Sequence, residues 1–321
     1  MHKLYSLWRA GSTYIFNVFR RSDYGYWAYN EPIHEIALNA KNQNNPEFFE
    51  KFTSDNLKPL RHPYLQKSYF YELQQTFNAW KGFIEKKMIL DDYFETNLSS
   101  PLENYLRAII KAAKGRPVIQ ECRTSCRIGT IKKNIGGKHI YLWRNPWDQW
   151  QSFKVNDEYF IVVCQIILGG LSVPKIISMI REEISYAEFH SENIAEEIAH
   201  FNQKKISPEH SYLVFYTLWC LGLMEGIRHA DLLISIDSLS YSLSYRMSIN
   251  NQLQMFDITD LDFSDCQVPQ FNFNENNREF FIPIENHVHE LLAVSGTSNE
   301  IINNMFKMRR QHEPQNFDNK N

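Results

Sequence analysis

The chain has 321 residues, of which 43% are hydrophobic, so it is long enough to bury a substantial core. Its formal net charge of −3 provides no overall positive field, which argues against nucleic acid or an anionic membrane as the main partner. Five scattered cysteines indicate free thiols, and no apolar run reaches the length of about 18 residues that predicts a membrane span, so we expect a cytoplasmic protein without a transmembrane anchor.

Residues 1–20 predict a strand, a tight turn and a helix. Residues 3–8 form a bulky run with β preference, residues 9–13 are polar or small, and from Tyr14 the apolar residues follow a helical spacing. Such a turn aims backbone N–H groups and the positive end of the helix dipole at one point, which suits an anion. The turn has one glycine and matches neither the Walker loop nor the dinucleotide fingerprint, so an ordinary strand-to-helix turn is the alternative interpretation.

A second helix is predicted to begin near Glu31. Pro32 suits the first turn of a helix, where its missing N–H would have no partner, and this places Asn30 or Glu31 at the cap. Glu31 and His34 would then share one helix face. A glutamate near a cap is a common structural device, so a structural and a catalytic role both stay open for Glu31.

Residues 138–143 predict a strand, and the segment after it carries a second candidate anion site. Asn145 is a suitable helix cap and Pro146 a suitable first helical residue. Arg144 would lie at the carboxyl end of the strand and Ser152 about two turns into the helix. An arginine fork and a hydroxyl in these positions can converge on one phosphate.

Arg127 is a candidate substrate contact. It follows the strand predicted at 117–122, at the end of the strand where open α/β sheets bind ligands. Arg127 also belongs to a basic passage, and a solvated helix face is the usual place for such residues.

The chain is predicted to have an α/β fold, with a mainly parallel sheet and helices on both faces. Helical stretches separate four predicted strands, at residues 3–8, 117–122, 138–143 and 231–236. We expect residues 1–308 to form one domain with helical insertions at about 66–114 and 155–226. The polar residues 309–321 are expected to form a disordered tail.

Two segments together resemble the nucleotide motifs of the sulfotransferases. The first is Arg9-Ala10-Gly11-Ser12-Thr13-Tyr14 and the second is Arg144-Asn-Pro-Trp-Asp-Gln-Trp-Gln-Ser152. The resemblance implies a P-loop-like fold in which the first segment binds the 5′-phosphosulfate of 3′-phosphoadenosine 5′-phosphosulfate. It also implies that Arg144 and Ser152 bind the 3′-phosphate of this donor.

Glu31-Pro32 looks like the Glu-Pro pair of bacterial carbohydrate sulfotransferases, where the glutamate is the general base. Arg9 stands where many cytosolic sulfotransferases have a lysine, as in the carbohydrate branch. The resemblance therefore implies an enzyme that sulfates a hydroxyl of a carbohydrate or glycolipid-like acceptor. It gives Arg9 the role of neutralising charge on the leaving phosphate, and makes Glu31 the first and His34 the second candidate for the base.

Two alternatives stay open at this point. An ATP- or GTP-dependent kinase-like P-loop enzyme would need a Gly-Lys-Ser/Thr loop and a magnesium-binding aspartate, and neither is evident in the sequence, so we expect no metal. A non-catalytic nucleotide- or carbohydrate-binding protein could keep the same cleft without turnover.

Overall fold

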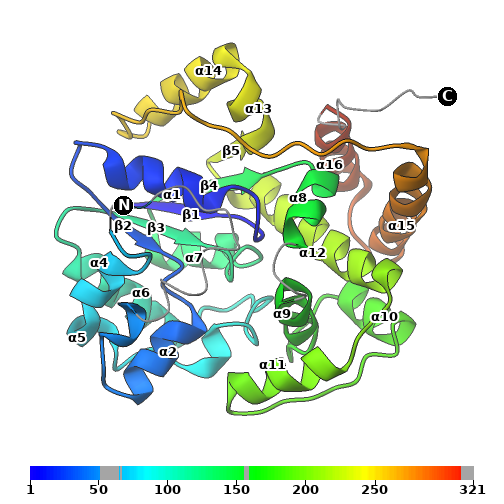
Figure 1. Ribbon diagram of the computed structural model, residues 1–321, viewed down its shortest axis with the longest axis horizontal. Coiled ribbons are helices and arrows are strands. Elements are labelled where there is room, and N and C mark those ends of the chain that lie inside the picture. The colour runs from blue at the N-terminus through cyan, green and yellow to red at the C-terminus, as the bar shows by residue number, and fades with distance from the viewer. Residues whose placement is uncertain (51–64, 66, 155–158, 312–321) are drawn as a thin grey trace.

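The protein is described by a computed structural model that covers residues 1–50, 65, 67–154 and 159–311. Five strands form one parallel sheet in the order β2-β3-β1-β4-β5, which lies to one side of the molecule, next to the helices α9 to α12 (Figure 1). The prediction of an α/β fold with a mainly parallel sheet is confirmed. The strands are β1 (His2–Tyr5), β2 (Tyr26–Asn30), β3 (Arg116–Glu121), β4 (Lys138–Trp143) and β5 (Leu232–Ser235).

Helices connect these strands and extend the domain beyond them. The helices up to β4 are α1 (Ser12–Arg21), α2 (Glu35–Asn42), α4 (Tyr71–Gln75), α5 (Phe77–Trp80), the 3-10 helix η2 (Lys86–Met88), α6 (Ser100–Ala112) and α7 (Ile128–Ile135). Between β4 and β5 lie α8 (Pro146–Phe153), α9 (Tyr159–Leu168), α10 (Lys175–Glu183), α11 (Ile194–Gln203) and α12 (Pro208–His229). After β5 follow α13 (Ile236–Tyr241), α14 (Leu243–Gln254), α15 (Glu275–Val294) and α16 (Asn299–Gln311).

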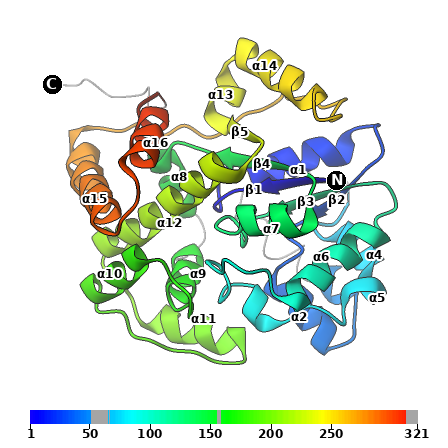
Figure 2. The same cartoon turned by 180° about the vertical axis from the view of Figure 1, so that it is seen from behind.

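Alternating side chains of the strands build two separate cores, one on each face of the sheet. Leu4 and Ile140 point to the face that α1, α13 and α14 cover. Their chain neighbours Tyr5 and Tyr141 point to the other face, where α7 and α12 lie across the sheet (Figure 2). The strands are therefore buried on both faces, and β1 and β3 contribute polar side chains, such as Lys3 and Gln120, to the interior as well.

Three predictions about elements need correction. None of the four predicted strands lies between residues 8 and 117, but Tyr26–Asn30 forms β2, a strand at one edge of the sheet, paired with β3. The helix expected at Pro32 begins three residues later, at Glu35. The tail expected from Arg309 begins later, because α16 continues to Gln311 and Arg309 is buried against Glu285.

Residues 312–321 of the expected tail lie outside the described residues, as do residues 66 and 155–158 of the expected insertions. The described parts of both insertions are rich in helix. Within the described chain, none of the helices combines the length and the apolar character needed to cross a membrane.

Candidate functional site

The chain leaves β1 toward one face of the sheet and leaves the neighbouring strands β3 and β4 toward the other. Helix α1, which follows β1, packs into the core around Leu4 and Ile140. Helices α7 and α8, which follow β3 and β4, pack into the opposite core. Such a divergence is a topological switch point, and ligands of open α/β sheets bind there at the carboxyl ends of the strands. The crevice at the end of β1 is therefore the candidate site.

The loop after β1 has a fixed and unusual backbone. Arg9 and Gly11 adopt positive φ angles of 67° and 86°. A side chain at position 11 would collide with Ile236, since an added Cβ would lie 2.8 Å from its Cγ2 atom. None of the described side chains caps α1, and the first turn of this helix holds no acidic residue. The amino end of α1 therefore presents backbone N–H groups that suit an anion.

Three side chains of this loop contact the protein itself. Ala10 is buried, the Oγ atom of Ser12 lies 3.8 Å from the Sγ atom of Cys122, and the hydroxyl of Tyr14 donates to Asp265 at 2.8 Å. The backbone of the loop, rather than the hydroxyls of Ser12 and Tyr14, is thus the part best suited to bind an anion.

Helix α8 lies against the same loop. The Nε atom of Arg9 donates to the main-chain oxygen of Ser152 at 3.2 Å, and the Nε2 atom of Gln149 donates to the main-chain oxygen of Trp8 at 2.7 Å. Asn145 caps α8 through its side chain, as predicted. The structure therefore brings Arg9 and Ser152, the ends of the two predicted phosphate-binding segments, into contact.

Arg144 does not extend into the crevice as the sequence suggested. Its Nε atom donates to Asp237 Oδ1 at 3.2 Å, and its NH2 group donates to the main-chain oxygen of Pro269. The same carboxylate accepts the N–H of Asn145 at 2.6 Å. Only 2% of Arg144 is exposed. The guanidinium thus belongs to a buried ion pair, and in this arrangement it does not fit a phosphate ligand.

Glu31 lies outside any helix, with a φ angle of 39°. Its Oε1 atom accepts the hydroxyl of Tyr69 at 2.8 Å, and its Oε2 atom accepts NH1 of Arg123 at 2.6 Å. Tyr69 and Arg123 therefore hold both oxygens of the carboxylate predicted as the base.

Arg123 is the central residue of this cluster, and the sequence analysis did not single it out. Its NH2 group donates to Glu35 at 2.8 Å, and its guanidinium lies 5.6 Å from the centre of the Trp8 ring. Only 1% of Arg123 is exposed, and the carboxylates of Glu31 and Glu35 compensate its buried charge. Because Arg123 follows β3 directly, the rule that selected Arg127 would also have selected Arg123.

The titratable groups around Arg123 have strongly shifted pKa values. Burial, reinforced by the positive charge of Arg123, lowers the pKa of His34 from 6.5 to about 4. Burial alone would raise the pKa of Glu35, but His34, Arg123 and the hydroxyl of Tyr159 outweigh it and lower this pKa to about 2. Burial raises the pKa of Glu121 from 4.5 to about 7. At neutral pH, His34 is therefore uncharged and Glu35 ionised.

Glu31 and His34 were predicted to share one helix face. This prediction is wrong, because His34 caps α2 and Glu31 lies before it. Its Nδ1 atom accepts the N–H of Ile36 at 3.1 Å and lies 3.2 Å from Glu35 Oε2. The main-chain N–H of Ile33 donates to Glu121 at 2.5 Å and fixes the turn after β2. This contact, between residues far apart in the sequence, prevents the helix from starting at Pro32.

Arg127 lies in the interior. Its NH2 group donates to the main-chain oxygens of Met88 and Arg123 at 2.8 and 3.0 Å, and only 1% of the residue is exposed. Within the described part of the chain, its Nε and NH1 atoms have no hydrogen-bond partner. A substrate could contact Arg127 only by entering the protein below the crevice.

Several other buried polar atoms near the strand ends also have no partner among the described residues. They are Trp8 Nε1, both side-chain polar atoms of Asn30, Gln120 Oε1, Arg123 Nε and Gln149 Oε1. Buried polar groups normally form hydrogen bonds, so such atoms call for water or a ligand. They all belong to segments at or just after the ends of β1 to β4, which agrees with a polar ligand in the crevice.

No protein-family model, curated protein or solved structure matches the chain. The chemistry of the site is therefore argued from its own residues. The loop after β1 fits the 5′-phosphosulfate of the donor that the sequence implies, because the uncapped amino end of α1 offers backbone N–H groups there. Arg144 fits the 3′-phosphate only if its bond to Asp237 is replaced.

Proposed function

We propose that the protein transfers a sulfuryl group from 3′-phosphoadenosine 5′-phosphosulfate to a hydroxyl of a carbohydrate or glycolipid-like acceptor. The observation that carries this proposal is that Arg123 binds Glu31 at 2.6 Å and lies 5.6 Å from the centre of the Trp8 ring, which joins the cluster around Glu31 to the loop after β1 and the uncapped amino end of α1. An anion site and a carboxylate are thereby held side by side at a switch point of a parallel sheet.

The transfer would be catalysed mainly by position and by neutralisation of charge. In a loose, in-line transfer the S–O bond to the leaving phosphate breaks as the acceptor oxygen approaches, and negative charge grows on the bridging oxygen. Backbone N–H groups of α1 and the guanidinium of Arg9 are the groups suited to stabilise this charge. The contact of Arg9 with the main chain of Ser152 orients its side chain.

Glu31 is the first candidate for the base that takes the proton of the acceptor hydroxyl. Arg123 and Tyr69 fix its two oxygens, so the carboxylate is held in one orientation. His34 stays the second candidate, but its Nδ1 atom accepts the N–H of Ile36, which places the proton of the neutral ring on Nε2. His34 could act as the base only if this capping bond is released. Such a base typically contributes a factor of about 10² to 10⁴ to the rate.

A non-catalytic binding protein is the second candidate. It is favoured by the buried ion pairs of Glu31 with Arg123 and of Arg144 with Asp237, since both predicted site residues already have partners of opposite charge. Under this function the crevice would bind the nucleotide or a saccharide but would not catalyse transfer.

Ligand-induced thermal stabilisation tests the proposal. Adenosine 3′,5′-bisphosphate should raise the melting temperature and ATP with magnesium should not, because the site has an anion loop without a Walker lysine. The reverse result would contradict a phosphosulfate site.

A Glu31→Gln variant should keep the stabilisation and lose sulfuryl transfer from labelled donor to a panel of saccharides. If wild-type protein binds the bisphosphate but transfers to no acceptor in the panel, the binding function is favoured.

A further inference from the structure

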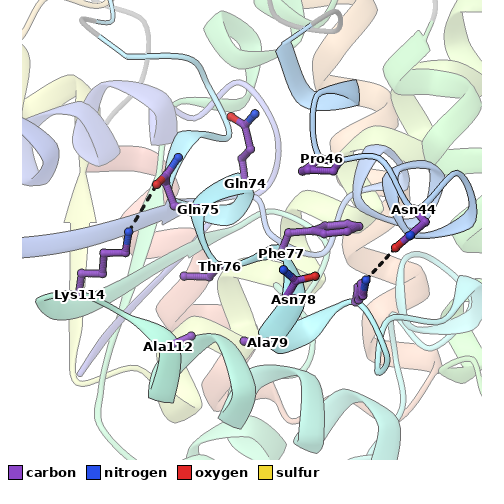
Figure 3. A pocket seen from close by; sticks show the side chains of 11 residues that line it. Asn44, Pro46, Gln74, Gln75, Thr76, Phe77, Asn78, Ala79, Ala112 and Lys114 are labelled. Atoms are coloured by element: carbon purple, nitrogen blue, oxygen red, sulfur yellow. Dashed lines mark hydrogen bonds between the residues drawn. The ribbon is translucent and has the colours of Figure 1, made fainter.

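A polar pocket lies on the outer side of α4 and α5, away from the crevice (Figure 3). One wall comes from Asn44 and Pro46, the floor from residues 74–79, and the opposite wall from Ala112 and Lys114. Lys114 precedes β3, which begins at Arg116. This wall therefore belongs to the amino edge of the sheet, whereas the candidate crevice lies at the carboxyl edge.

The charges of the pocket are of one sign. Lys81 and Lys114 line it, and none of the described lining residues is an aspartate or glutamate. The protein as a whole has a net charge of −3, so this local excess of positive charge is not a property of the entire surface. Two ammonium groups without a lining carboxylate favour an anionic ligand.

Contacts with neighbouring side chains hold each ammonium group in place. Lys81 donates to Asn44 Oδ1 at 2.7 Å and lies 5.1 Å from the centre of the Phe77 ring. Lys114 donates to Gln75 Oε1 at 3.4 Å. Figure 3 shows Asn44 and the pair of Lys114 with Gln75 on opposite sides of the pocket. An ammonium group has three N–H donors, so each lysine can bind an anionic group in addition to its amide partner.

Four carboxamide side chains line the pocket together with the two lysines. Asn44, Gln74, Gln75 and Asn78 all line the pocket. A carboxamide both donates and accepts hydrogen bonds, and a hydroxyl group does the same, so the two are matched partners. Gln74 donates to Glu50 at 3.1 Å, which fixes the orientation of its amide. A ligand that carries several hydroxyls between two anionic groups would satisfy this arrangement.

We propose that this pocket binds an acidic saccharide, with carboxylate or sulfate groups at Lys81 and Lys114 and sugar hydroxyls at the carboxamides. The binding does not depend on the transfer reaction proposed above, because the pocket shares none of its residues with the crevice. The protein would thus hold an acidic glycan at a second place on its surface.

Isothermal titration calorimetry with trigalacturonate tests this site, with the neutral maltotriose as the reference ligand. The full-length protein should bind trigalacturonate, bind maltotriose more weakly, and lose affinity for trigalacturonate as salt is raised. The double variant Lys81→Gln/Lys114→Gln should bind trigalacturonate at least about tenfold more weakly, because two charge-assisted bonds are removed. A matched control, Lys111→Gln/Lys133→Gln, removes the same charge from exposed positions outside the pocket and should bind like wild type.

Other results would overturn the proposal. The proposal is wrong if wild-type protein does not bind trigalacturonate. It is also wrong if both double variants lose the same affinity, because this would indicate general charge attraction. Equal affinity for tricarballylate, a tricarboxylate without sugar hydroxyls, would reject the saccharide class. Thermal unfolding of each variant shows whether it is folded, and an Asn78→Ala variant, which keeps both lysines, should also weaken trigalacturonate binding. The affinity for trigalacturonate and its loss in these variants do not depend on whether adenosine 3′,5′-bisphosphate binds the crevice.

Discussion

Arg144 and Asp237, 93 residues apart in the chain, form a buried ion pair in which Nε lies 3.2 Å from Oδ1. The pair joins the end of β4 to the first turn of α13, directly after β5. A phosphate that binds Arg144 must therefore compete with the carboxylate of Asp237.

This competition predicts the effect of Asp237→Asn. The variant should unfold at a lower temperature, because the charge of Arg144 is left uncompensated in the interior, at a cost of about 3 to 5 kcal/mol. Its stabilisation by adenosine 3′,5′-bisphosphate should nevertheless exceed that of wild type, measured as the shift in melting temperature of each protein relative to its own ligand-free form. Asp231→Asn removes a carboxylate at the other end of β5 and should leave the shift unchanged. An unaltered shift in Asp237→Asn would show that Arg144 is purely structural.

Three glycine variants separate backbone strain from steric collision. Gly82→Ala should be nearly neutral, since its added Cβ meets no atom and its φ angle is ordinary. Gly25→Ala should cost about 1 kcal/mol, because the φ angle of 74° is unfavourable although the space is open. Gly11→Ala should cost about 1 to 3 kcal/mol more, because it adds the collision with Ile236. Urea denaturation gives the three free energies of unfolding, and equal losses at positions 11 and 25 would refute the collision.

Replacing Arg123 should destabilise the protein strongly. Arg123→Met leaves Glu31 and Glu35 as buried carboxylates without their partner, which predicts a loss of about 3 to 5 kcal/mol in the free energy of unfolding at pH 7. Arg107→Met is the matched control. Arg107 also pairs with a glutamate, at 2.7 Å, but its side chain is 54% exposed, so we expect a loss below about 0.5 kcal/mol. Similar losses in the two variants would contradict the central role of Arg123.

His34 should make stability depend on pH in a defined window. Its folded pKa of about 4 lies below the ordinary 6.5, so the unfolded chain binds the proton more readily. The stabilisation is complete above pH 6.5 and is lost as the pH falls from 6.5 through 4, by up to about 3 kcal/mol. His34→Asn retains a capping side chain and should reduce the slope of the stability profile in this window, while the buried His2 and His139, whose pKa values are also lowered to about 4, keep part of it. Urea titrations at a series of pH values measure the slope, which would be unchanged if His34 were not responsible.

Glu35 should also make the protein less stable as the pH falls, but in a lower pH range than His34. Its pKa is lowered from 4.5 to about 2, so its stabilising effect is present above pH 4.5 and is lost as the pH falls toward 2. Glu35→Gln should therefore reduce the steepness of acid unfolding below pH 4.5 while the slope between pH 6.5 and 4.5 persists.

Four of the five strands, including the edge strand β5, could be predicted from the sequence, whereas the other edge strand, β2, could not. β3 and β4 lie within one residue of their predicted positions, because glycines precede both strands and mark where each begins. β2 consists of Tyr26–Asn30, directly after Gly25. Its tyrosines and tryptophan favour a strand, but the polar residues and the glycine before them indicate a turn, and the pairing with β3 decides the outcome.

The candidate site could be predicted in part. The loop of Arg9 and Gly11 lies at a strand end, as its glycine and helical spacing indicated, and Asn145 caps α8. The pairing of Arg144 with Asp237 and of Arg123 with Glu31 could not be predicted, because residues about 90 positions apart meet only once the sheet is assembled. Spacing rules identify such residues one at a time and do not reveal their partners.

The loop after β1 holds two left-handed residues within three positions, and Gln149 binds the main-chain oxygen of Trp8 beside them. Its shape is therefore set by the fold before any ligand arrives. A ligand that meets a preorganised loop loses little free energy in ordering it. The loop also cannot reshape itself around a poorly fitting anion, so we expect the crevice to discriminate between a tetrahedral anion and a planar carboxylate by geometry, even where the two carry equal charge.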